Sequence, residues 1–291
     1  MNWIERLNNS INYIENNLTE KMDIKDIANE ANTSHFHFQR MFAIICDMTV
    51  ADYIRRRRLT LSAGEIQQGK GILDTAIKYG YESQASFTRA FSKMYGFTPA
   101  KSREPGVKLK AYPPLTFNIS IKGAHSMDYE IRDVKGFEIA GEIRQISTVN
   151  GQNYIEIPKF WQEINNNKKF KEIEKNKNVS GLLKGSYVGA CMDFNEKEER
   201  LNYMIGMEPS KSTDLKSLDK RVIPPLTWAV FPGCGKMPDS IQSVWKRIFS
   251  EWFPATDYLH AEGPELEIYP PMEEESEEIP FEIWIPIEKK K

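Results

Sequence analysis

The chain has 291 residues, and its 39 Lys and Arg against 41 Asp and Glu give it a net charge of −2. This length is sufficient for two domains with separate hydrophobic cores. No apolar run approaches the ~18 residues of a membrane-spanning helix, and the first residues do not form a signal peptide, so we expect a cytoplasmic protein without a membrane partner. Because Cys46, Cys191 and Cys234 are far apart, we expect no disulfide framework and no cysteine-based zinc site. His35 and His37 would lie about 200° apart on a helix and the other two histidines are isolated, so we expect no metal. We also expect no cofactor.

The first predicted elements are two short helices separated by a turn, Ile24–Ala31 and Ser34–Ile45. Asp23 and Ser34 are suited to cap their N-termini by accepting hydrogen bonds from free backbone amides. Each helix has one apolar stripe at helical spacing. The stripe of the second helix leaves an unusual set for a purely structural helix on its other faces: His35, Phe36, Gln39 and Arg40.

A long helix, Val50–Gln68, is predicted to follow. It carries four consecutive arginines, Arg55 to Arg58, which spread over about 300° around the helix axis and cannot all face one partner. Two interpretations stay open. In the first, one or two of them contact DNA phosphates, and the others pair with acidic residues of neighbouring helices or stay solvated. In the second, none of them contacts DNA.

The plan of two short helices then repeats at Ile72–Tyr79 and Ser83–Tyr95. Gly80 tolerates a left-handed turn between them, Ser83 is the next cap, and the first helix is expected to bury Ile72, Ala76 and Ile77. The second is expected to bury Phe87, Ala90, Phe91 and Met94 and to expose Gln84, Ala85, Ser86 and Arg89. Arg can bond guanine and Gln adenine in the major groove, each pair giving about 1–3 kcal/mol of discrimination.

This second helix pair carries a dozen positions in fixed register that resemble the signature of the AraC/XylS family of transcriptional regulators: Ala76, Gly80, Tyr81, Ser83, Ser86, Phe87, Arg89, Phe91, Gly96, Thr98, Pro99 and Arg103. The first pair, from Ser34 to Phe42, resembles the MarA, SoxS and Rob branch. The resemblance implies that Phe36, Gln39 and Arg40 face bases or line the groove in the first unit. It implies the same for the second-unit set Gln84, Ala85, Ser86 and Arg89, with Ala85 at a position where that branch often has a polar residue.

The charge distribution fits this resemblance. Between Phe36 and Arg103 eleven basic residues stand against five acidic ones, a net +6, which leaves −8 for the rest of the chain. A basic segment on an acidic body fits one-sided contact with double-stranded DNA. We expect one chain to place two helices in successive major-groove segments about 34 Å apart, and so to bind as a monomer. By resemblance, RNA polymerase is a further partner.

Past Arg103 the composition changes, and Pro105-Gly106 and Pro113-Pro114 indicate a linker. Period-two alternation then predicts strands at Phe117–Lys122, Met127–Val134, Phe137–Ile146, Tyr187–Phe194, Tyr203–Glu208, Leu226–Pro232, Glu265–Tyr269 and Phe281–Pro286, and two helices at Ile155–Phe170 and Asp239–Trp252. We therefore expect a DNA-binding domain at 1–105, a linker with a first edge strand at 106–125, and a second domain at 126–291.

The second domain contains a strand-helix-strand-strand repeat, from Phe137 to Glu208 and from Leu226 to Pro286. The predicted fold is thus an all-α N-terminal domain with two helix-turn-helix units joined by a long helix, then an α+β domain of two such repeats. A groove between the halves is the natural ligand site. This part resembles the GyrI-like effector-binding domains in its strand order and in the ending Glu265–Tyr269 followed by Phe281–Pro286.

Aromatic residues are concentrated in this domain, and together with a carboxylate they favour a flat or lipophilic cation as ligand. The resemblance implies that a glutamate on a late strand pairs with the ligand, and Glu267 is the best positional match, with Glu282 second. The aromatic candidates are Trp161, Tyr187, Trp228, Phe231, Trp245, Tyr269 and Trp284. The alternative is that these rings are ordinary core and that Glu267 is solvated on its strand.

The predicted function is a sequence-specific transcription regulator, an activator, modulated by a small-molecule effector. We expect no enzyme, because the sequence has no nucleophile elbow, phosphate-binding glycine loop or paired-histidine motif. Two alternatives stay open: a DNA-binding regulator whose second domain is structural or sequestering, and a GyrI-like domain with a minor hydrolase activity. Turnover of a bound ligand would distinguish the last.

Overall fold

The computed structural model describes residues 3–117, 126–148, 152–165, 168–195, 198, 200–210, 215, 217–272 and 276–289. The chain divides into two compact units, Met1–Ile121 and Lys122–Lys291. Each unit is described by itself. Among the described helices, none has both the length and the apolar character that crossing a bilayer requires.

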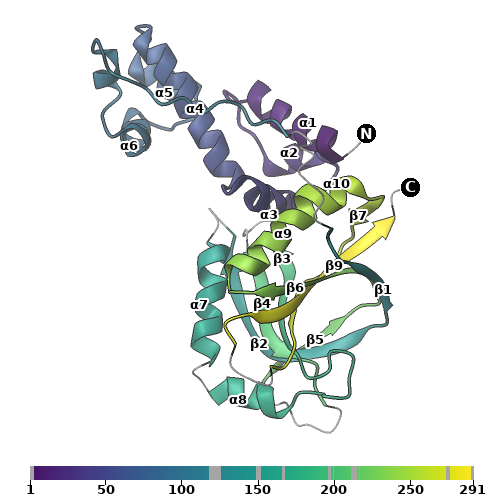
Figure 1. The fold of residues 1–291 in the computed structure, drawn as a ribbon. Coiled ribbons are helices and arrows are strands. Elements are labelled where there is room, and N and C mark those ends of the chain that lie inside the picture. Colours follow the sequence, from purple (N-terminus) through teal and green to yellow (C-terminus); the bar gives the residue numbers. More distant parts are fainter. Residues whose placement is uncertain are drawn as a thin grey trace. The chain divides into compact units, whose positions relative to one another are not determined.

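The first unit is helical (Figure 1) and contains α1 (Trp3–Asn16), α2 (Ile24–Glu30), α3 (His35–Cys46), α4 (Val50–Gln67), α5 (Ile72–Lys78), α6 (Gln84–Tyr95) and a short 3₁₀ turn, Ala100–Arg103. The two predicted helix-turn-helix pairs are α2 with α3 and α5 with α6, and α4 joins them. The all-α domain with two such units is therefore confirmed. Helix α1, which packs against α2, is an element that the sequence patterns did not predict.

Both helix-turn-helix turns are built by the residues expected to build them. Asn32 (φ 49°) and Gly80 (φ 78°) take left-handed conformations in the first and second turn, which suits Asn and Gly. Ser34 accepts a hydrogen bond from His37 N (3.3 Å) at the start of α3. Ser83 accepts one from Ser86 N (3.2 Å) at the start of α6. The two units therefore share one local design.

Two expectations about exposure are wrong. His35 is buried, because it lies three and seven residues before Phe38 and Phe42 and so shares their buried stripe. Ile77 is 60% exposed. Helix α5 has only seven residues, and its face with Ile72, Thr75 and Ala76 is turned toward the core. Ile77 follows Ala76 directly, so its side chain points away from that face.

The four arginines of α4 all have partners within the first unit. Arg55 pairs with Asp52, and the Arg56 guanidinium lies over the Tyr112 ring, 5.1 Å from its centroid. Arg57 forms a buried ion pair with Glu15 (2.7 Å). Arg58 donates to the carbonyl oxygens of Leu18 (2.8 Å) and Glu20 (2.7 Å). Arg56, Arg57 and Arg58 therefore join α4 to neighbouring segments, whereas the Arg55 pair lies within α4 itself.

The second unit is a curled antiparallel sheet with helices (Figure 1). Its strands are β1 (Glu130–Val134), β2 (Phe137–Ser147), β3 (Tyr187–Asn195), β4 (Arg200–Met207), β5 (Asp219–Ile223), β6 (Leu226–Gly235), β7 (Tyr258–His260), β8 (Glu265–Tyr269) and β9 (Ile279–Lys289). Its helices are α7 (Asn153–Asn165), α8 (Lys168–Lys175), α9 (Asp239–Arg247), a π-helical turn (Ile248–Trp252) and α10 (Phe253–Ala255).

The strand order β1-β6-β9-β8-β3-β4-β2-β5 reveals the internal repeat. In each half the third strand lies between the first and the second, giving β6-β9-β8 on one side and β3-β4-β2 on the other. Helix α7 packs on β2 and helix α9 on β6, the first strand of each half. The predicted pair of strand-helix-strand-strand repeats is confirmed, and β8 beside β3 forms the seam between the halves.

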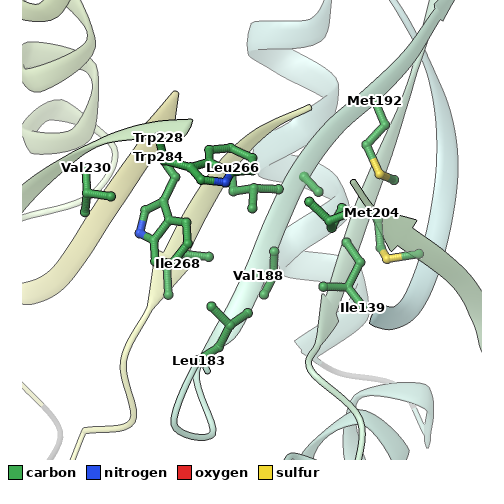
Figure 2. Close-up of a cluster of buried hydrophobic side chains, with 12 residues drawn as sticks. Ile139, Leu183, Val188, Met192, Met204, Trp228, Val230, Leu266, Ile268 and Trp284 are labelled. Atoms are coloured by element: carbon green, nitrogen blue, oxygen red, sulfur yellow. The ribbon is translucent and has the colours of Figure 1, made fainter. Parts of the chain in front are cut away.

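The two faces of the sheet are occupied differently. Residues directly opposite each other on paired strands share a face, so Leu266 and Ile268 of β8 lie with Trp284 of β9 and with Val188 of β3. These side chains belong to one buried cluster that joins both halves (Figure 2), with Ile139, Leu183, Ala190, Met192, Met204, Ile223, Trp228 and Val230. Glu267 and Tyr269 of β8 lie on the other face.

Some boundaries differ from the prediction. The single expected helix Ile155–Phe170 is present as α7 and α8. The expected helix Asp239–Trp252 changes to a π-helical turn at Ile248. Strands β5 and β7 were not predicted, and with three residues β7 is too short for a clear alternation. Most of the expected strand Phe117–Lys122 lies outside the described residues.

Candidate functional site

Helix α6 presents most of the predicted DNA-contacting residues of the second unit to the surface. Gln84, Ala85 and Arg89 are exposed, and Ser86 is partly exposed. The Ser86 hydroxyl donates to the Ser83 carbonyl oxygen (2.8 Å) and accepts from Ser83 N (3.3 Å), which completes a capping box. The Ser86 side chain therefore stabilises the helix start, and among these four residues Gln84 and Arg89 are the exposed side chains with hydrogen-bond donors.

Helix α3 carries the corresponding residues of the first unit. Gln39 and Arg40 are partly exposed on α3, and Phe36 lies in its first turn. We call α3 and α6 the reading helices. Helix α4 between them has 18 residues and is about 27 Å long at 1.5 Å per residue. A connector of this length is suited to hold two reading helices about one turn of DNA apart.

In the second unit, Glu267 lies on the seam between the repeats, where β8 pairs with β3. It stands directly opposite Gly189 on β3. A Cβ atom at position 189 would lie 2.2 Å from the Tyr203 hydroxyl oxygen and 3.2 Å from Glu267 Oε2. Gly189 therefore provides the space in which the side chains of Tyr203 and Glu267 meet.

The Glu267 carboxylate accepts three hydrogen bonds from neutral aromatic side chains. Trp245 Nε1 on α9 donates to Oε1 (3.0 Å). The hydroxyls of Tyr203 on β4 and Tyr269 on β8 each donate to Oε2 (3.1 Å). Trp161 Nε1 on α7 donates to the Tyr203 hydroxyl (2.9 Å), which extends the network to the helix of the other half. We call these five residues the Glu267 cluster.

The surroundings keep the two phenols protonated. Burial, and then the charge of Glu267, raises the pKa of Tyr203 well above its usual value. The same two causes, in the same order, raise the pKa of Tyr269. Both hydroxyls are therefore donors at neutral pH. Among the ion pairs of the described residues, none involves Glu267, so its hydrogen-bond partners leave its negative charge uncompensated.

Two other predicted ligand residues share this face without joining the cluster. Tyr187 stacks on Phe170, with ring centroids 5.0 Å apart, and the Lys177 ammonium lies 4.0 Å from the Tyr187 centroid. Burial, followed by the charge of Glu174, raises the pKa of Tyr187 to about 12. Phe231 is fully buried against Trp252, at a centroid separation of 5.0 Å. Both rings have structural contacts.

The remaining three candidates lie on the opposite face of the sheet. Trp228 and Trp284 pack edge to face, with centroids 5.7 Å apart, in the buried cluster of Figure 2. Glu282 is opposite Ile268 and thus on that same face. It accepts from Trp284 Nε1 (2.7 Å) and pairs with Arg132 (3.2 Å). Among the described residues, Glu282 has a cationic partner and Glu267 has none.

Sequence reasoning missed Tyr203, a member of the cluster, and Gly189, which provides the space for it. Tyr203 lies two residues from Leu201 and from Ile205 on β4 and so shares their face. This pattern predicts core packing only. A glycine inside a strand signals a close approach of another group, and Gly189 in the middle of β3 carried this signal. The identity of the approaching hydroxyl follows from the strand order, which no local pattern contains.

Two family models match the chain. Residues 130–287, more than half of the chain, match the model described as an integron-associated effector binding protein. Residues 27–104 match a model of a helix-turn-helix domain. The boundaries of these matches fall within the two units of the structure.

Two relatives of the first unit have the names of transcription regulators. The chain is 41% identical over 103 residues to “Probable transcription factor PqrA” of Proteus vulgaris, covering 34% of this chain and 84% of that protein. It is 38% identical over 92 residues to “HTH-type transcriptional activator AarP” of Providencia stuartii, covering 31% and 68%. A solved structure of SAV2435 bound to tetraphenylphosphonium is similar over 56% of this chain and 94% of its own, with 20% identity and a TM-score of 0.48.

Proposed function

Since the chain belongs to the AraC/XylS family of DNA-binding transcription regulators and carries a GyrI-like effector-binding domain, we propose that it is a cytoplasmic activator whose second unit binds a lipophilic cation. In this proposal the first unit reads DNA with α3 and α6. The second unit senses the effector at the Glu267 cluster. RNA polymerase is the partner through which DNA binding becomes activation.

The observation that carries the ligand proposal is that Glu267 has hydrogen-bond donors but no cationic partner among the described residues. Its three hydrogen-bond partners are neutral, and no ion pair of the described residues neutralises it. A carboxylate held by donors but lacking a cationic partner attracts a ligand that supplies the missing positive charge. Tryptophan and tyrosine rings around it add cation–π attraction, which favours cations with delocalised charge or a large apolar surface.

The DNA proposal is supported by two similar units on one chain. Paired reading helices on a common connector supply in one molecule what many regulators obtain by dimerisation. A monomer can then bind an asymmetric site, since its two units have different exposed residues. Exposed Arg and Gln side chains on α6 have the chemistry to distinguish base pairs in the major groove.

The DNA proposal is tested by fluorescence anisotropy of the full chain with genomic fragments selected for binding and with random DNA of equal length. We expect the selected fragments to bind at least 10³-fold more tightly at physiological salt, the lower range for specific readers. Equal affinity for selected and random DNA at low salt would contradict the function as a sequence-specific regulator.

The ligand proposal is tested with tetraphenylphosphonium as the probe and tetraphenylmethane-like neutral compounds of similar shape as controls. Tryptophan fluorescence quenching should report binding, since Trp161 and Trp245 belong to the Glu267 cluster. Glu267→Gln should weaken binding of the cation about tenfold or more, a loss of about 1.4 kcal/mol or more. Binding of the neutral compound should change little.

Glu282→Gln is the matched control, because Glu282 lies on the other face with Arg132 as partner. It should leave cation binding unchanged. If Glu282→Gln weakens cation binding and Glu267→Gln does not, the ligand site is on the opposite face of the sheet. If neither variant changes affinity, the carboxylate mechanism fails, and a structural or sequestering role of the second unit becomes the better account. Chemical turnover of the probe would favour the hydrolase alternative.

A further inference from the structure

Residues 107–117, which the sequence marks as linker, follow the surface of the first unit in an extended path without helix or strand. We call this segment the strap. Its partly buried residues are Val107, Leu109, Tyr112, Leu115 and Phe117, and the residues between them are exposed. An ordinary flexible linker has no such pattern, because fixing it costs about 1–2 kcal/mol of backbone entropy per residue.

The middle of the strap is held by α4. Tyr112 N donates to Thr60 Oγ1 (3.2 Å), and the Tyr112 carbonyl oxygen accepts from Arg57 Nη1. The Arg56 guanidinium lies over the Tyr112 ring. Two consecutive arginines of α4 are thus used on one strap residue. The backbone groups of the strap find side-chain partners here in place of a secondary-structure ladder.

The end of the strap is held by α4 and α1 together. Leu115 N donates to the Tyr53 hydroxyl (3.1 Å), which itself donates to Glu15 of α1 (2.7 Å). The Asn8 side chain of α1 forms two hydrogen bonds with Phe117. It accepts from Phe117 N (2.8 Å) and donates to the Phe117 carbonyl oxygen (2.9 Å). This pairing fixes both backbone polar groups of Phe117.

The strap therefore touches both halves of the DNA-binding unit. At its start, Leu109 packs on the buried cluster formed by α4, α5 and α6. At its end, Phe117 is bound to α1, the helix that packs on α2 of the first helix-turn-helix unit. Arg57, which holds Tyr112 of the strap, also forms a partly buried ion pair with Glu15 that joins α4 to α1. One extended segment spans the distance between the supports of the two reading helices.

We propose that the strap sets the relative position of the two helix-turn-helix units, and that Asn8 is a positioning residue for DNA recognition although it lies on neither reading helix. This inference rests on the proposed reading of DNA by α3 and α6. A site that is contacted by both units gains the second contact only if the units are held at the correct spacing. Loosening the strap should therefore reduce that gain and leave each unit's own contacts intact.

The test compares Asn8→Ala with the control Asn12→Ala, an exposed position on the same helix, in the full chain. One measurement is amide hydrogen exchange of Tyr112, Leu115 and Phe117, which should be slow in the wild type and faster in Asn8→Ala. The other is the ratio of affinities for a selected DNA site and for the same DNA with the half recognised by one unit scrambled. In Asn8→Ala this ratio should fall about fivefold, which corresponds to about 1 kcal/mol.

The outcomes separate the inference from the proposed function. Faster exchange of the strap with an unchanged affinity ratio would overturn the positioning role, as would unprotected strap amides in the wild type. An equal loss of affinity for intact and scrambled DNA would assign Asn8 to stability alone. Tyr53→Phe, which removes the hydroxyl that binds Leu115, should reproduce the effect. If the wild-type chain binds selected and scrambled DNA equally, the proposed DNA-reading function is contradicted. Hydrogen exchange would then still report whether the strap is docked.

Discussion

At the residue scale, the Glu267 cluster depends on Gly189, because any side chain at this position would fill the space in which Tyr203 and Glu267 meet. Gly189 lies on β3 opposite Glu267, and Tyr203 reaches Glu267 across the space that a Cβ at position 189 would fill. Tyr203 is fully buried, so its ring has no free volume into which to retreat. The position of the Glu267 carboxylate therefore depends on Gly189, although glycine has no side chain that could contact a ligand.

This coupling predicts a non-additive pair of variants. Gly189→Ala should weaken tetraphenylphosphonium binding about tenfold by displacing the Tyr203 hydroxyl, and Tyr203→Phe should weaken it similarly by deleting that hydroxyl. The double variant should bind like Tyr203→Phe alone, because the atom that clashes is gone. Calorimetric titration of all four proteins measures the coupling. Additive losses would show that Gly189 acts elsewhere in the sheet.

A second prediction at this scale concerns base reading. Arg40→Ala and Arg89→Ala should each weaken binding to selected DNA by about 1–3 kcal/mol and spare random DNA. Arg55→Ala is the control, since Arg55 is half-exposed on α4 and pairs with Asp52. It should affect selected and random DNA alike. Equal loss on both DNAs for Arg89→Ala would mean that Arg89 contacts phosphate and reads no base.

At the scale of single elements, the reading helix α6 depends on its cap. The Ser83 hydroxyl accepts from Ser86 N, and Ser86 returns a bond to the Ser83 backbone. Ser83→Ala should lower the free energy of unfolding by about 0.5–2 kcal/mol, as for other N-cap serines. Urea denaturation followed by circular dichroism measures this. Ser92→Ala within the same helix serves as control, and a similar loss there would remove the special role of the cap.

Local patterns predicted the elements that have strong local signals. Caps and apolar stripes located α2, α3, α5 and α6, because these features depend on residues within a few positions of each other. The same reasoning failed at Ile77, where a seven-residue helix leaves too few positions to define a stripe. It also missed α1, whose role is to support α2 and to hold the end of the strap through Asn8.

At the scale of the whole molecule, a chain of net charge −2 has a segment of net charge +6 between Phe36 and Arg103. Several of these basic residues, Arg56 to Arg58 among them, are engaged within the first unit. Arg55, Lys78 and Arg103 also have partners there, so six of the eleven basic residues are engaged. The protein should therefore neutralise no more than about five phosphates. The net charge of the whole chain therefore gives no sign of a basic DNA-binding surface. The number of basic residues, in turn, is larger than the number available to contact phosphates.

The salt dependence of DNA binding should report that number. A plot of log affinity against log salt concentration is expected to have a slope between about −3 and −5, from about 0.9 per phosphate contact. Anisotropy titrations on the selected DNA at several salt concentrations measure it. A slope near zero would contradict contact through the basic segment. A slope steeper than about −9 would mean that the paired arginines of α4 are released to contact DNA.

The sequence by itself determined the two helix-turn-helix units and the repeat in the second unit, because these follow from spacing, capping and period-two patterns. Glu267 was chosen through the resemblance to the GyrI-like domains, and its role stays a prediction. Only the tertiary structure decided which candidates meet. Pairing of β8 with β3 places Glu267 beside Tyr203 and Gly189, whereas Trp228, Trp284 and Glu282 lie on the opposite face. The tertiary structure also showed that residues 107–117 of the proline-rich linker are docked on the first unit as the strap. Such contacts join residues far apart in the chain, and no local pattern specifies which distant strand or helix a segment will meet.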